Sequence, residues 1–259
     1  MNSFKLVLFF MFFICNIIIS VYIFSNGFLI RRVSLSNKNT ESFNNLKKFN
    51  KSIVLFIDAL RFDFIFTNKN PNLYGLSIIE QLIENEPKNA KLFKFIADPP
   101  TTTMQRIKAL MSGTLPTFID AGSNFDSYLI EDDNLIQQTY LNNKSVIILG
   151  DDTWLSLFDS KMIKEHYTYP SFNIKDLDSN DINVDNSLRR IFKSSKTSWN
   201  LIIAHYLGLD HCGHTFGPKN PVLKRKLNDI NETISLVVDS IDSETLLIVI
   251  GDHGMTETG

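Results

Sequence analysis

The chain has 259 residues, which is enough for one large α/β domain and additional segments. Its net charge of −2 offers no basic surface for nucleic acid, and its 21% of charged residues is typical of a globular rather than a disordered chain. The two cysteines, Cys15 in an apolar run and Cys212 in a polar segment, exclude a disulfide scaffold.

The N-terminal segment, residues 6–30, is almost wholly apolar. About 20 such residues cross a bilayer as a helix, whereas the apolar core of a cleaved signal peptide spans about 7–15 residues. We therefore predict a transmembrane anchor at residues 1–32, in preference to a signal peptide. Arg31 and Arg32 at its far end would by themselves place the following domain in the cytosol.

A stretch rich in Ser, Asn and Lys follows at residues 33–50 and is predicted to be a linker, and residues 51–259 are predicted to form the globular domain. In this domain, short apolar runs typical of buried parallel strands alternate with segments of helical spacing. The predicted strands are residues 53–57, 92–96, 145–149, 201–207 and 246–250, and the predicted helices are residues 75–86, 104–111 and 221–240. This alternation, without an internal repeat, predicts an α/β fold with a parallel sheet.

Chemically reactive side chains follow four of these strands. They are Asp58, the threonines at 101–103, Asp210 with His214, and Asp252 with His253. Each alone has an ordinary explanation as a helix cap, a turn or a loop hydrogen bond. Because the carboxyl ends of parallel strands meet at one edge of a sheet, we expect these groups to cluster there. His205, inside a strand, is interpreted as a core histidine without a role.

Three carboxylates and two imidazoles in one place repel or titrate unless a cation holds them. Carboxylate oxygen and imidazole nitrogen suit zinc, and two metal ions about 4 Å apart clamp the attacking and leaving oxygens in phosphoryl transfer. A threonine hydroxyl is a poor nucleophile until a metal lowers its pKa, and the start of a helix favours an incoming phosphate. The pattern therefore indicates metal-assisted phosphoryl transfer.

Six segments, in this order, resemble motifs of the GPI ethanolamine-phosphate transferases, a family of the alkaline-phosphatase-like superfamily. The segments are FIDALRFD at 56–63, PTTTMQRIKAL at 100–110, GTLPTFID at 113–120, GDDTW at 150–154, HYLGLDHCGH at 205–214 and GDHGMT at 251–256. The best resemblance is to the type that modifies the third mannose. It covers about residues 50–259. It implies a mostly parallel sheet with helices on both faces, and an N-terminal part of a longer enzyme.

The resemblance also implies an activity and a location. The family transfers phosphoethanolamine from phosphatidylethanolamine to a mannose of the GPI glycolipid precursor, in the membrane of the endoplasmic reticulum. A small membrane-protein subunit is a possible partner, and no nucleic acid is expected. The catalytic domain would be lumenal, against the charge bias at Arg31 and Arg32, since large domains translocate largely regardless of such charge. The sequons at Asn50, Asn143 and Asn231 fit a lumenal glycoprotein.

Carried over position by position, the resemblance implies two Zn²⁺ ions. Asp58, Thr103, Asp252 and His253 would surround one ion, and Asp210 and His214 would hold the other. Thr103 would be the nucleophile. In the family, a further histidine of the second site follows the segment that ends here at Gly259, so we expect the sequence to be truncated within that site.

Other positions carry weaker implications. Asn124 falls where relatives place an amide that steadies the transferring phosphate. Asp151 and Asp152 match a family motif, and their ordinary role would be to cap a helix that begins near Trp154. Two alternatives remain for the function: a zinc-dependent phosphodiesterase of the same superfamily that uses water as acceptor, and a catalytically incomplete, membrane-tethered fragment.

Overall fold

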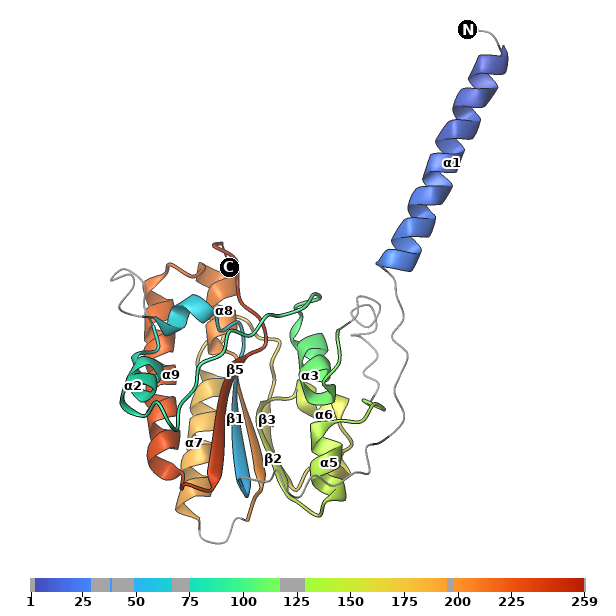
Figure 1. Ribbon diagram of the computed structural model, residues 1–259. Coiled ribbons are helices and arrows are strands. Elements are labelled where there is room, and N and C mark those ends of the chain that lie inside the picture. Colours follow the sequence, from blue (N-terminus) through green and yellow to red (C-terminus); the bar gives the residue numbers. More distant parts are fainter. Residues whose placement is uncertain are drawn as a thin grey trace.

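The computed structural model describes residues 3–28, 38, 49–66, 75–116, 129–194 and 198–258. The helices and strands alternate along the chain, as expected for an α/β fold (Figure 1). They are α1 (Ser3–Gly27), β1 (Lys51–Ile57), η2 (Phe62–Ile65), α2 (Ser77–Asn85), α3 (Thr103–Ser112), α5 (Leu135–Leu141), β2 (Val146–Asp151), α6 (Thr153–Leu157), η3 (Ser160–Met162), β3 (Glu165–Tyr169), α7 (Ser179–Lys193), β4 (Leu201–Tyr206), α8 (Gly208–Phe216), α9 (Pro221–Ser240) and β5 (Thr245–Gly251).

The five strands form one parallel sheet in the order β3-β2-β4-β1-β5. β1 lies between β4 and β5, with Ile57 paired to Tyr206 on one side and to Gly251 on the other. The carboxyl ends of these three strands are therefore neighbours at one edge of the sheet. This register places the residues that follow β1, β4 and β5 side by side.

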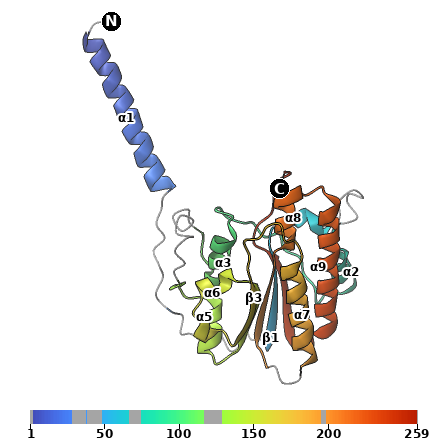
Figure 2. The same cartoon turned by 180° about the vertical axis from the view of Figure 1, so that it is seen from behind.

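Helices cover both faces of the sheet, as the two opposite views show (Figures 1 and 2). On one face, side chains such as Leu55 and Leu149 pack with apolar residues of α7, α8 and α9. On the other face, Phe56 and Ile148 pack with α3, α5 and α6. Successive residues of a strand point to opposite faces, so a continuous apolar run such as 53–57 serves both cores.

The structure confirms four of the five predicted strands and the three predicted helices, including the helix at Pro221–Ser240. The predicted strand at 92–96 is wrong. Residues 91–98 form neither helix nor strand, and Phe93 and Ile96 are 80% and 72% exposed. The apolar run is short enough for a strand, but a strand also needs a hydrogen-bonded neighbour, and none of the described residues pairs with this segment. β3, α5 and α7 were not among the predicted elements.

The apolar N-terminal segment forms the helix α1. It is long and apolar enough to cross a membrane, and none of its apolar window is buried against the described part of the chain. Of the predicted linker at 33–50, only residues 38, 49 and 50 are described.

Candidate metal and phosphoryl-transfer site

Four elements bring the predicted residues to the carboxyl edge of the sheet. Asp58 follows β1 directly, Asp252 and His253 follow β5, and Asp210 lies in the first turn of α8, just beyond β4. Thr103 is the first residue of α3, which packs on the same edge. Ligand atoms of Asp58, Asp210 and His253 lie within 4.8 Å of one another, in a group that could hold a metal ion.

Asp58 is the centre of this cluster and is almost fully buried. Its Oδ1 lies 3.1 Å from Nε2 of His253, and its Oδ2 accepts a hydrogen bond of 3.1 Å from the hydroxyl of Thr103. The neighbouring threonine, Thr102, instead directs its hydroxyl to Gln105. Among the three adjacent threonines, Thr103 is therefore the one whose hydroxyl contacts a carboxylate of the cluster.

Asp252 is fully buried and is fixed through one oxygen. Its Oδ1 accepts backbone N–H bonds from Ala59, at 3.1 Å, and from His253, at 2.8 Å. Ala59 has a φ of 58°, a left-handed conformation that is uncommon for a residue with a side chain, and this turn after β1 directs its N–H at Asp252. The other oxygen, Oδ2, lies 3.4 Å from Nε2 of His253.

His253 is oriented by its own loop. Its Nδ1 lies 2.7 Å from the carbonyl oxygen of Gly254, to which an Nδ1–H donates. Nε2 then faces the carboxylates of Asp58 and Asp252. A hydrogen bond from one ring nitrogen to a backbone carbonyl is the usual way to present the other nitrogen to a metal.

The segment that contains Asp210 and His214 is a helix, α8, rather than a loop. The spacing of four residues places both side chains on one face, with His214 Nε2 3.4 Å from Asp210 Oδ1. The Asp210 side chain is largely buried, whereas that of His214 is 58% exposed. His214 is therefore at the outer rim of the cluster.

Burial and neighbouring charges shift the pKa values of the acidic and imidazole groups in this cluster. Burial, with the nearby charge of Asp58, raises the pKa of Asp210 to about 6 and that of Asp252 well above its usual value. Burial lowers the pKa of His253, but its contact with Asp58 and the charge of Asp252 outweigh this and raise it to about 10. Burial raises the pKa of Asp58, but the imidazoles of His253 and His205 and the hydrogen bond from Thr103 outweigh it, so that the pKa of Asp58 is lowered.

Two buried carboxylate oxygens of the cluster, Asp58 Oδ1 and Asp252 Oδ2, lie 3.1 and 3.4 Å from Nε2 of His253 and make no other hydrogen bond within the described residues. Buried carboxylates are costly unless a cation balances them, and either a protonated His253 or a metal ion can do so. The ligand atoms of Asp58, Asp210 and His253, with Asp252 Oδ2 beside His253, form a set of carboxylate oxygens and imidazole nitrogen that fits zinc. The residues present therefore fit a divalent metal ion.

The remaining predicted residues are Asn124, Asp151 and Asp152. Asn124 is not among the described residues. Asp152 is the N-cap residue of α6, but its side chain makes no capping hydrogen bond and accepts one from Ser171 instead. Asp151, one residue earlier, accepts the N–H of Thr153 in the first turn of α6.

Arg106 is a residue of this site that sequence reasoning missed. It is 2% exposed on α3, and its Nε donates 2.8 Å to the backbone carbonyl of Asp252. Its Nη1 donates 3.1 Å to the carbonyl of Asp98. Arg106 thus ties the helix of Thr103 to the loop of Asp252. The available signal was its position one helical turn after Thr103, on a helix packed against the core.

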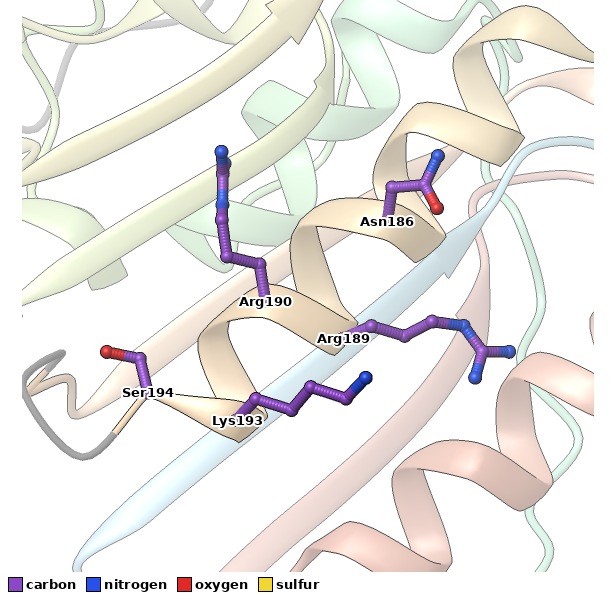
Figure 3. A pocket seen from close by; sticks show the side chains of 5 residues that line it. All are labelled: Asn186, Arg189, Arg190, Lys193 and Ser194. Atoms are coloured by element: carbon purple, nitrogen blue, oxygen red, sulfur yellow. The ribbon is translucent and has the colours of Figure 1, made fainter.

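A separate surface hollow lies on α7 (Figure 3). It is lined by Asn186, Arg189, Arg190, Lys193 and Ser194. Arg190 lies over the ring of Tyr167, 4.2 Å from its centre. None of the predicted site residues lines this hollow.

Comparisons with known proteins agree with the geometry. The family model for type I phosphodiesterases and nucleotide pyrophosphatases matches residues 133–259. GPI ethanolamine phosphate transferase 3 of Saccharomyces cerevisiae is 41% identical over 93% of the chain, and the catalytic subunit of the Homo sapiens enzyme of that name is 39% identical over 92%. The chain spans about a quarter of the length of each of these relatives, 25% and 24%.

Among solved structures, murine ectonucleotide pyrophosphatase/phosphodiesterase 5 shares the fold. The match has a TM-score of 0.53 at 16% identity and covers 79% of this chain and 57% of that one. Together with the parallel sheet, this likeness confirms the predicted alkaline-phosphatase-like fold class.

Proposed function

We propose that this chain belongs to the GPI ethanolamine phosphate transferase family, and that its site transfers phosphoethanolamine from phosphatidylethanolamine to a mannose, the third, of the GPI-anchor precursor. The observation that carries the proposal is the contact between the hydroxyl of Thr103 and Asp58, inside a cluster of carboxylates and imidazoles. A hydroxyl at that place can serve as a nucleophile toward phosphorus.

We assign the metal ligands as a proposal. Asp58, Thr103, Asp252 and His253 would hold one zinc ion, and Asp210 and His214 would contribute to a second. Bound zinc would lower the pKa of the hydroxyl and stabilise the charge of the transition state. The buried oxygens of Asp58 and Asp252 beside Nε2 of His253 support the first site. The placement of Asp210 within 4.8 Å of ligand atoms of Asp58 and His253 supports an adjacent second one.

The residues of the chain have distinct tasks in this reaction. Asp58 orients the hydroxyl of Thr103, and the positive end of the α3 helix dipole favours the phosphate. The Thr103 oxygen forms a bond to phosphorus while the bond to the diacylglycerol oxygen breaks, and diacylglycerol leaves with a proton. The mannose hydroxyl then attacks the phosphothreonine ester and gives up its proton, and Thr103 is restored. The amide of Asn124 would steady the phosphate.

The same proposal includes a location. α1 would anchor the chain in the endoplasmic-reticulum membrane, with the α/β domain in the lumen next to both lipid substrates. Lumenal placement agrees with the sequons at Asn50 and Asn143, whose asparagines are exposed. A small membrane-protein partner is consistent with the name of the human relative, which is called a catalytic subunit.

The test is phosphoethanolamine transfer by Thr103→Ala, with bound zinc assayed beside it. We expect transfer to fall by about a hundredfold or more, because no other hydroxyl has the position of Thr103, while zinc binding largely persists through Asp58, Asp252 and His253. Thr103→Ser keeps the hydroxyl and should retain part of the activity. Thr102→Ala is the matched control, since Thr102 contacts Gln105 instead of Asp58.

Near-normal transfer by Thr103→Ala would remove Thr103 from the mechanism. Loss of transfer together with loss of zinc would make the residue structural. Hydrolysis of phosphatidylethanolamine by the wild type without any glycan acceptor would favour the phosphodiesterase alternative. A wild type that binds one zinc ion and catalyses neither reaction would favour the incomplete, membrane-tethered fragment.

A further inference from the structure

We propose that His205 is a positioning residue of the metal site, whose Nε2–H orients the central carboxylate of Asp58 from inside the sheet. The inference rests on the proposed metal site. The sequence pattern predicts only a core histidine at position 205, and the burial of His205 agrees with that interpretation. Its contacts, however, point toward the site.

The imidazole of His205 is fully buried in β4 and held on several sides. Phe56, its partner in β1, packs edge-on against it with ring centres 4.7 Å apart. The backbone carbonyl of His205 accepts a hydrogen bond from Asn180. Gly150 of β2 has no side chain, and a Cβ there would collide with the same carbonyl. The strand and its ring therefore have little freedom to move.

Trp154 determines which ring nitrogen of His205 carries the proton. The indole Nε1–H of Trp154 lies 3.0 Å from His205 Nδ1, and an indole N–H can only donate. Nδ1 must then be the acceptor, so the ring is neutral with its proton on Nε2. Asp151 Oδ2 lies farther from Nδ1, at 3.5 Å. The buried tryptophan thus sets the tautomer in which Nε2 is a donor.

This Nε2–H donor has no hydrogen-bond partner among the described residues. The nearest carboxylate oxygen is Oδ2 of Asp58, 3.8 Å away, which accepts the hydroxyl of Thr103. When Thr103 gives up its proton as a nucleophile, that oxygen loses its donor. A shift of the Asp58 carboxylate by about 1 Å toward the fixed ring would bring its Oδ2 within hydrogen-bond distance of His205 Nε2, and this bond would hold the carboxylate in place. Metal-ligating carboxylates are commonly fixed by such an outer hydrogen bond.

A purely structural role explains less. A histidine needed only to accept the hydrogen bond of Trp154 would leave a donor buried and unpaired, on the side that faces the ligand Asp58. Any residue that filled the space and accepted one hydrogen bond would serve. The two roles therefore make different predictions: only the positioning role predicts that loss of the Nε2–H weakens zinc binding.

The experiment measures zinc affinity of the full chain in detergent, by competition with a fluorescent chelator. His205→Phe keeps the volume and loses the donor, and we expect its zinc affinity to fall about 10- to 100-fold. His205→Gln restores an acceptor for Trp154 and a donor toward Asp58, and should recover most of the affinity. Tyr206→Phe is the matched control, because it removes a buried polar contact to Asp185 on the other face of β4. Its zinc affinity should stay within about twofold of the wild type.

A further variant covers the case in which His205→Phe fails to fold. Trp154→Phe leaves His205 in place but removes the donor to Nδ1. The proton can then move to Nδ1, next to Asp151, and leave a lone pair facing Asp58, so zinc affinity should fall here too. Thermal unfolding of every variant separates affinity from stability.

Unchanged zinc affinity in His205→Phe or in Trp154→Phe would overturn the proposal and leave the metal site intact. So would a His205→Gln variant as weak as His205→Phe, because packing alone would then explain the loss. A wild type that binds no zinc would overturn both this inference and the proposed metal site.

Discussion

At the scale of single residues, His253 is the group whose protonation a metal ion would change most. Its Nε2 lies within 3.4 Å of oxygens of Asp58 and Asp252, and these contacts raise its pKa to about 10 despite its burial. Without a metal, His253 is therefore protonated at neutral pH and partly neutralises the carboxylates. A metal ion at the same point needs the nitrogen lone pair and must displace that proton.

Zinc binding should accordingly release about one proton per ion at about pH 7.5. The apparent zinc affinity should rise about tenfold per pH unit and level off near the pKa of His253, about 10. Below about pH 6, the raised pKa of Asp210 adds a second competing proton and steepens the fall. Calorimetry in buffers of different ionisation enthalpy counts the protons. His253→Asn is the control and should release no such proton. A wild-type count near zero would contradict this assignment.

At the scale of elements, α8 carries Asp210 and His214, and its start is fixed by buried charges. Asp181 Oδ1 accepts the N–H groups of Leu207, at 3.0 Å, and Gly208, at 3.2 Å. Its other oxygen lies 2.8 Å from the ammonium of Lys226, which is 1% exposed. The carboxylate is favourable at a helix N-terminus and is itself paired. The helix of Asp210 and His214 is therefore anchored to α7 and α9.

Gly208→Ala should destabilise the chain by about 1–3 kcal/mol, because an added Cβ would collide with Lys226, Asp181 and the carbonyl of Leu177. Gly213→Ala in the same helix is the matched control. Its Cβ would meet only the flexible end of Met255, at 3.0 Å, and alanine favours a helix interior. Denaturant unfolding of both variants tests this, and equal loss of stability would show that close packing at Gly208 is unimportant.

At the scale of the whole molecule, the chain combines an exposed apolar helix with a folded α/β domain. None of the apolar window of α1 is buried, whereas both cores of the domain are built from the sheet and from helices α2, α3 and α5 to α9. An apolar helix of 25 residues left in water is unfavourable, and a bilayer removes that cost.

Removal of residues 1–48 should therefore release the domain from membranes without unfolding it. Carbonate extraction of membranes checks this: the full chain should stay in the pellet and the shortened chain should appear in the supernatant. The mass of the N-terminal peptide of the full chain tests the alternative of a cleaved signal peptide. A shortened chain that stays in the pellet would place the membrane contact in the domain instead.

Local sequence determined the elements whose pattern is self-contained. The apolar runs at 53–57 and 246–250 specify strands, although only the first is buried on both faces; the second forms the edge strand β5, in which Ile248 is 39% exposed. The helix at Pro221–Ser240 follows from its apolar spacing. The same local patterns predict that Asp58, Asp252 and Asp210 lie just beyond the ends of strands. The pattern at 92–96 failed because a strand also needs a neighbour, and the local sequence does not contain that information.

Only the tertiary structure decided which groups meet. The order β4-β1-β5 brings three strand ends together, and this order depends on the packing of the whole sheet. Thr103 rather than Thr102 faces Asp58 because of how α3 docks on the sheet, and the docking depends in part on Arg106. The register of β1 and β4 places the His205 ring next to the carboxylate of Asp58. Periodicity along a chain predicts burial, whereas the direction of a side chain toward a distant one is set only when the elements pack.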